Sequence, residues 1–122
     1  MDLNDVCYDI LKLSPKIRFV GVYYHNELTS KSRSLLDSMI TEEQSKGSIQ
    51  GTVIRWNSRK MLRQTLGMPH YALALYDKVF RVTFALQDDD LIFVSIDTDC
   101  DIMGIIESIQ KLQKKIIQKL YL

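Results

Sequence analysis

Apolar and polar residues repeat along this chain with two periods, and the period changes from segment to segment. Apolar residues at three- and four-residue spacing, the period of an amphipathic helix, occupy 3–13, 41–65 and 102–120. Alternating or β-branched and aromatic residues, which are typical of strands, occupy 17–24, 71–76, 79–86 and 91–96. A turn at 25–27 leads into a short returning strand at 28–30. The predicted order is helix, two strands, helix, three strands, helix.

Capping residues and proline predict where the helices begin and end. Asp2 or Asn4 caps the first helix, which ends before Pro15 because the residue before proline avoids helical geometry. Residues 41–44 fit a capping box for the long middle helix. Before it, the pattern of residues 32–40 predicts a short helix or the lead-in to the longer one.

Three glycines inside the predicted elements indicate close packing by neighbours. Gly21 lies within the first strand, and Gly47 and Gly51 lie one turn apart on the middle helix. The strand 91–96 is apolar at nearly every position, which predicts a central strand covered on both faces. Asp99 or Asp101 caps the last helix.

This order of elements resembles the roadblock/dynein-light-chain domains, whose general design longin and profilin domains share. Residues 17–30 resemble the opening hairpin of that family, although the turn at 25–27 lacks the glycine that the family often has. Residues 79–106 resemble its closing hairpin and last helix. The stretch from Val53 to Ala74 also resembles a family of small uncharacterised archaeal proteins, which names no activity. The predicted fold is a single-domain α+β roadblock-like sandwich over residues 1–122, with a five-stranded antiparallel sheet. The alternative is a PAS- or GAF-like sensor fold, which places short helices where this chain has one long helix.

The roadblock resemblance implies a non-enzymatic homodimer that binds small GTPases or scaffolds signalling complexes. In that family the long middle helix and the third strand join two protomers into one continuous sheet. A symmetric partner strand would also cover the third strand, which we expect to be an edge. Carried over by position, the interface consists of Ile49, Val53, Trp56, Lys60, Tyr71, Leu73 and Leu75. An exposed Trp56 at the centre of this patch would be a binding hot spot.

Composition and charge fit a small intracellular domain and exclude several classes of protein. The 122 residues suffice for one domain, and a formal charge of +1 gives neither a strong basic nor a strong acidic field. No apolar run approaches the roughly 20 residues that span a bilayer, and the start lacks the regions of a signal peptide. Two cysteines far apart in sequence are typical of a cytoplasmic protein, and Cys7 falls on the apolar stripe of the first helix.

No group of residues in the sequence completes a catalytic or metal site, so we expect no enzyme activity, no metal and no cofactor. Residues 97–101 place aspartates at alternate positions, like the start of a calcium loop. However, Ile102 takes the place of the glycine of that loop and Ser108 the place of its glutamate. The aspartates at 88–90 lie about 20 Å away along a strand, so the two runs cannot share one ion.

A basic stripe on the middle helix is the remaining candidate for partner binding. Arg55, Arg59 and Arg63 follow a spacing of four, which lines them along one helical face. Such a face is solvated in most proteins, and the alternatives are an acidic partner protein or, less favoured by the near-zero net charge, nucleic acid. A ligand-sensing function would instead need a cavity of several hundred Å³ between the sheet and the helices.

Overall fold

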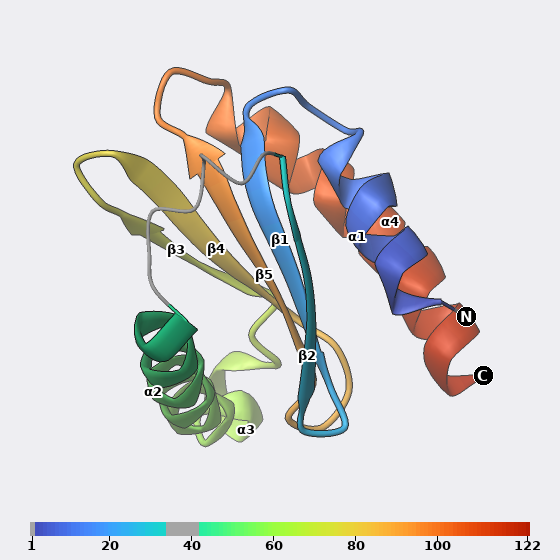
Figure 1. Cartoon of the computed structure of the whole chain (residues 1–122). Coiled ribbons are helices and arrows are strands. Elements are labelled where there is room, and N and C mark those ends of the chain that lie inside the picture. Colours follow the sequence, from blue (N-terminus) through green and yellow to red (C-terminus); the bar gives the residue numbers. More distant parts are fainter. Residues whose placement is uncertain (1, 34–41) are drawn as a thin grey trace.

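The computed structural model describes residues 2–33 and 42–122, and the side chains of the second range from residue 47 onwards. The sheet has five antiparallel strands in the order β2-β1-β5-β4-β3 (Figure 1). The elements along the chain are α1 (Leu3–Leu11), β1 (Ile17–Tyr24), β2 (Glu27–Ser32), α2 (Glu42–Lys60), α3 (Arg63–Leu66), β3 (Tyr71–Leu75), β4 (Val79–Ala85), β5 (Leu91–Asp97) and α4 (Ile102–Tyr121). The predicted order of helices and strands is confirmed, with α3 as an addition.

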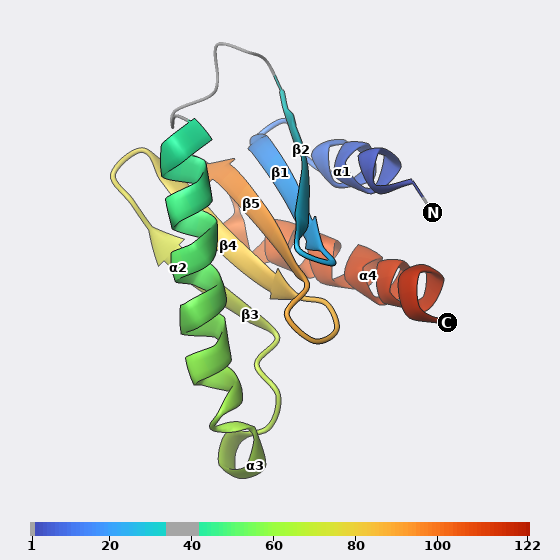
Figure 2. The same ribbon diagram turned by 60° about the horizontal axis from the view of Figure 1, so that its bottom comes forward.

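The sheet separates two layers of helices. Helices α1 and α4 lie side by side on one face, and α2 crosses the other face (Figures 1 and 2). Successive residues of a strand point to opposite faces, so β5 contributes to both cores. Its residues Ile92 and Val94 are buried on the α1/α4 side, while Leu91 and Phe93 are buried beside Trp56 of α2. The prediction of a central strand covered on both faces is confirmed.

The predicted caps of α1 and α4 are present, but α1 ends two residues earlier than expected. The Asp2 side chain accepts a hydrogen bond from the amide of Asn4 at 2.9 Å, and that of Asp101 accepts one from the amide of Gly104 at 3.2 Å. Leu13, expected on the buried stripe of α1, is 41% exposed. The helix stops at Leu11 because the chain must turn before Pro15 to enter β1.

The β1–β2 hairpin turns without a glycine. His25 and Asn26 adopt positive φ angles of 51° and 66°, as the two central residues of a type I′ turn do. Strand β2 then runs to Ser32, which pairs with Phe19, so it is longer than the predicted 28–30. Ser32 belongs to this strand and not to a helical segment. Backbone pairing with β1 extends the strand where the side chains show no apolar alternation. Residues 34–40 of the predicted segment, and the capping hydroxyl of Thr41, lie outside the described residues.

Gly21 of β1 has the close neighbours that its position predicted. A Cβ atom on Gly21 would lie 3.1 Å from Cδ1 of Leu28 and 3.3 Å from Cε1 of Phe19. These side chains cover the backbone of β1 on the face toward α2. Glycine is therefore the residue that lets both of them close over the strand.

The middle helix is shorter than predicted. An unbroken helix to about Thr65 was expected, but α2 ends at Lys60 and a separate short helix, α3, begins at Arg63. At the break the amide of Leu62 bonds to the carbonyl three residues back, Arg59, at 3.1 Å. Met61 and Leu62 are 84% and 54% exposed, so burial of these side chains does little to hold the helix straight past Lys60. No helix among the described residues is long and apolar enough to cross a membrane.

Candidate interaction surface

Strand β3 forms one free edge of the sheet, and three of the predicted interface residues present that edge. Within the described residues β3 pairs only with β4. The amide of Tyr76 donates to the carbonyl of Val79 at 2.8 Å, which makes them a hydrogen-bonded pair. Hydrogen-bonded and non-hydrogen-bonded pairs alternate in an antiparallel ladder. The backbone groups of Tyr71, Leu73 and Leu75 therefore point away from β4.

The two edges of the sheet differ in their chemistry. Strand β3 reads Tyr-Ala-Leu-Ala-Leu and carries no charge, and its Leu73 and Leu75 are 41% and 67% exposed. Strand β2, at the opposite edge, carries Glu27 and Lys31. Charged side chains on an edge strand oppose pairing with another strand, while an apolar edge invites it. Of the two edges, β3 is the one suited to pairing with a second chain.

The side chains of β3 divide between the two faces of the sheet. The ring of Tyr71 lies 6.1 Å from that of Phe84 and packs on the α1/α4 core, whereas Ala72 packs toward the Trp56 cluster under α2. By the same alternation, Leu73 and Leu75 point to the side away from α2. The predicted interface therefore does not form one continuous side-chain patch with α2, and its β3 part is a backbone edge.

Helix α2 has one face on the sheet and one face toward solvent. Ile49 and Val53 are half-buried and pack on the cluster around Trp56. On the other side Ile54 is 67% exposed, and a Cβ atom on Gly47 would meet no described atom within 4 Å. The glycines are predicted to allow close packing by a neighbouring element. At Gly47 no described element of this chain fills that space.

The prediction of an exposed Trp56 is wrong. Its side chain is 2% exposed and packs against Leu91 and Phe93 of β5. The helical period correctly places Trp56 on one stripe with Ile49 and Val53. That stripe faces the sheet of the same chain, because the sheet needs an apolar cover on this side. Trp56 is a core residue of the protomer.

Lys60, a further predicted interface residue, is bound within the protomer. Its Nζ donates to the carbonyl of Asp88 at 2.9 Å and lies 3.3 Å from Oδ1 of Asp89. The Lys60 side chain is 18% exposed. It joins the end of α2 to the β4–β5 turn, so its ammonium group already has partners before any second chain binds.

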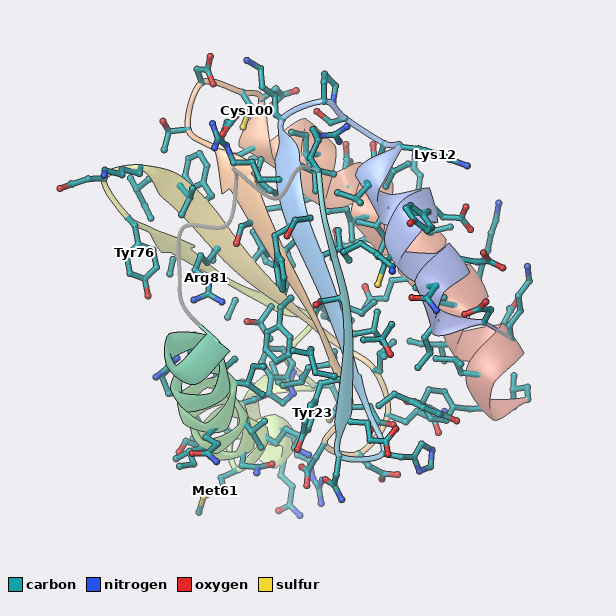
Figure 3. All side chains as sticks on the ribbon, viewed as in Figure 1. Lys12, Tyr23, Met61, Tyr76, Arg81 and Cys100 are labelled. Carbon is teal, nitrogen blue, oxygen red and sulfur yellow. The ribbon has the colours of Figure 1, made fainter. Side chains whose placement is uncertain are left out.

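The arginines of α2 line a pocket together with an arginine that the sequence analysis did not single out. The pocket, of about 70 Å³, lies between α2 and strands β3 and β4. Arg55 and Arg59 line it from α2. Arg81 lines it from β4, on the side of the sheet that α2 covers (Figure 3). Arg63 belongs to α3, beyond the break, and does not line the pocket. The predicted stripe of three arginines on one helix is therefore wrong.

A sequence signal for Arg81 exists in the alternation of β4. Phe80 and Val82 pack on the α1/α4 core, so Arg81 between them must face α2. Its Nη1 donates to Oγ of Ser48 at 2.8 Å. Only the crossing of α2 over β4 brings this strand residue next to helix residues some thirty positions earlier.

The acidic runs are engaged in pairing and capping. Asp97 pairs with Arg18, and Asp99 with Lys16 at 2.9 Å. This contact with the Lys16 ammonium group lowers the pKa of Asp99 and raises the pKa of Lys16. Asp101 caps α4. Among residues 2–33 and 47–122, no three His, Cys, Asp or Glu side chains gather as metal ligands do.

The cavities described in the structure do not match a sensor domain. The pocket under α2 measures about 70 Å³, against the roughly 300–1,000 Å³ of ordinary small-molecule sites. A wider hollow of about 330 Å³ lies at the surface, lined by His70 and the mostly exposed side chains Glu107, Gln110, Lys111 and Lys114. Neither is an enclosed space of several hundred Å³ between the sheet and a helix.

The architecture is a roadblock/longin-like α+β fold, as the resemblance implied, with the 19-residue α2 in the place of the short helices of a PAS- or GAF-like domain. Sequence comparisons give no match to a known protein family and none to a curated protein. Solved structures do match. MglB of Myxococcus xanthus has a TM-score of 0.72 at 14% identity, covering 95% of this chain and 92% of its own. The gliding protein MglB of Thermus thermophilus has a TM-score of 0.66 at 9% identity, covering 95% of this chain and 88% of its own. MglC of Myxococcus xanthus has a TM-score of 0.63 at 10% identity, covering 98% of this chain and 100% of its own.

Proposed function

We propose that this chain is a non-enzymatic, dimeric interaction module of the roadblock type, which regulates or scaffolds a small GTPase or signalling complex. The observation that carries the dimer is the uncharged edge of β3, whose outward backbone groups belong to Tyr71, Leu73 and Leu75. Two such edges related by a two-fold axis would satisfy each other and join the two sheets into one. The outward face of α2 flanks that joint with exposed Ile54 and the open position at Gly47.

The proposed interface differs from the one expected from the sequence alone. Tyr71, Leu73 and Leu75 contribute through their backbone, and Ile49 and Val53 through their half-exposed surface on α2. Trp56 supports the interface from the core beneath α2 and does not touch the partner. This division makes the edge of β3 the element to test.

A lysine on the edge tests the dimer directly. Leu73→Lys places a charge on β3 at a position that is 41% exposed, so it should leave the protomer folded and oppose strand pairing. Sedimentation equilibrium should give a dimer for the wild type and a monomer for this variant. Ser30→Lys, the same change on the exposed edge strand β2, is the matched control and should remain dimeric. A wild-type mass of one chain at micromolar concentration would refute the proposal.

The GTPase part rests on the roadblock resemblance and needs its own experiment. Native lysate of the source organism is supplemented with GDP or with a non-hydrolysable GTP analogue. Proteins are then captured from it with the wild type and, separately, with the monomeric Leu73→Lys variant. We expect one small GTPase to be enriched by the wild type in one nucleotide state and lost with the variant. If no GTPase is enriched in either nucleotide state, the proposed GTPase binding is contradicted. The sedimentation mass tests the proposed dimer separately.

A further inference from the structure

The pocket between α2 and the sheet gathers positive charge. Arg55 and Arg59 line it from the helix and Arg81 lines it from β4, so three arginines from two elements surround about 70 Å³. Guanidinium groups present planar forks of N–H donors that match the oxygens of phosphate and carboxylate groups. We propose that this pocket binds a single small oxyanion of the phosphate class.

The arginines lack a counter-charge among the described side chains. The described ion pairs, Lys16–Asp99, Arg18–Asp97 and Lys60–Asp89, all lie elsewhere. The described side-chain partner of Arg55 is the neutral hydroxyl of Thr52, at 3.1 Å, and that of Arg81 is the neutral hydroxyl of Ser48, at 2.8 Å. Each guanidinium has five N–H donors, so most remain for a ligand. Like charges around one pocket repel one another, and an anion bound among them would lower that cost.

The lining sets the size and charge of the ligand. Ala72 and Ala74 of β3 carry small side chains and leave space above the strand, while Thr83 adds a hydroxyl. A volume near 70 Å³ is well below the roughly 300–1,000 Å³ of ordinary small-molecule sites, which favours a small ion over a nucleotide. Three positive charges balance a doubly charged phosphate better than a singly charged carboxylate.

The pocket lies within one protomer, so this proposal does not rest on the proposed function. Its elements α2 and β3 also flank the proposed dimer edge. Phosphate binding by a chain that remains monomeric would support the oxyanion site and refute the dimer. A dimer that does not bind phosphate would support the dimer and refute the oxyanion site.

The test is a nuclear magnetic resonance titration of the ¹⁵N-labelled full chain with inorganic phosphate, at constant ionic strength held with chloride. We expect saturable shifts of the amide signals of Thr52, Ala74 and Thr83. Arg81→Gln should raise the dissociation constant for phosphate by about tenfold or more, because it removes a charged donor. Arg55→Gln, at an exposed position that leaves the core intact, should raise it as well. Arg63→Gln removes an equal charge outside the pocket and should leave the constant unchanged.

Three results would overturn the proposal. The first is that phosphate shifts these signals no more than chloride does. The second is that Arg63→Gln weakens phosphate binding as much as Arg81→Gln does, which would mean general charge attraction. Stronger binding of acetate than of phosphate, at equal ionic strength, would contradict the phosphate class. A dispersed amide spectrum shows that a variant is folded. If Arg81→Gln does not fold, Arg55→Gln still tests the proposal.

Discussion

The hydroxyl of Tyr121 donates a hydrogen bond of 2.6 Å to Oδ2 of Asp90. Tyr121 is the last residue of α4, and Asp90 ends the turn before β5. The other oxygen of Asp90 accepts a hydrogen bond from the amide of His25 at 3.0 Å, and the carboxylate is buried. One aspartate thus joins the β1–β2 turn, the β4–β5 turn and the end of the last helix. This contact also explains why a third aspartate in a turn-forming run is buried while its two neighbours are exposed.

We expect Tyr121→Phe to lower the free energy of unfolding by about 1–2 kcal/mol, because a buried carboxylate loses a donor. Urea denaturation followed by circular dichroism measures this loss. Tyr76→Phe, which removes the same hydroxyl from a side chain that is 54% exposed, is the matched control and should change little. Equal stability of both variants would show that the bond to Asp90 contributes nothing.

Trp56→Ala should destabilise the fold by about 3–5 kcal/mol, a large part of the stability of an ordinary domain. The reason is that Trp56 is 2% exposed and fills the core between α2 and β5. Trp56→Phe keeps most of the apolar volume and should cost less. As Trp56 is the one tryptophan of the chain, its fluorescence should move to longer wavelength on unfolding. A stable, folded Trp56→Ala protein that has merely become monomeric would contradict the core assignment.

Arg33→Ala should lower the free energy of unfolding by about 1–3 kcal/mol. Its Nη2 donates to the carbonyls of Leu11 at 2.7 Å and Ser14 at 2.9 Å, and its Nε donates to that of Ile17 at 2.8 Å. The guanidinium thereby closes the end of α1 onto the start of β1. Arg33→Lys keeps the charge without the fork and should recover only part of the loss. Thermal denaturation compares these variants with Arg63→Ala, an exposed arginine whose removal should have little effect.

Alkaline pH should destabilise the protein through Cys7. Burial raises the pKa of the Cys7 thiol from 9.0 to about 11, so the folded chain keeps this proton when the unfolded chain has lost it. The contribution of the neutral thiol is therefore full below pH 9 and is lost as pH rises from about 9 toward 11. Melting temperatures of the wild type should fall more steeply over this window than those of Cys7→Ala, which cannot ionise. Parallel curves would mean that Cys7 does not titrate with unfolding.

Some elements could be predicted closely from the sequence because their residues repeat with one clear period. Strand β1 has the predicted bounds, β4 and β5 differ from prediction by one residue at one end, and α4 ends one residue later than expected. Strand β2 was predicted too short, since its pairing with β1 depends on backbone groups that all residues share. The end of α2 differs from prediction because helical spacing continues through Met61 and Leu62 although both side chains are largely exposed.

The sequence by itself determined which residues share a face within each element, and so it determined the order of elements, the central place of β5 and the burial of Cys7. The tertiary structure alone decided what each face meets. It placed Trp56 against β5, bound Lys60 to the β4–β5 turn and brought Arg81 to the same pocket as Arg55. The physical reason is that periodicity describes one helix or strand about its own axis. Contacts between elements far apart in the chain depend on how α2 crosses the sheet, and that crossing is set by the packing of the whole domain.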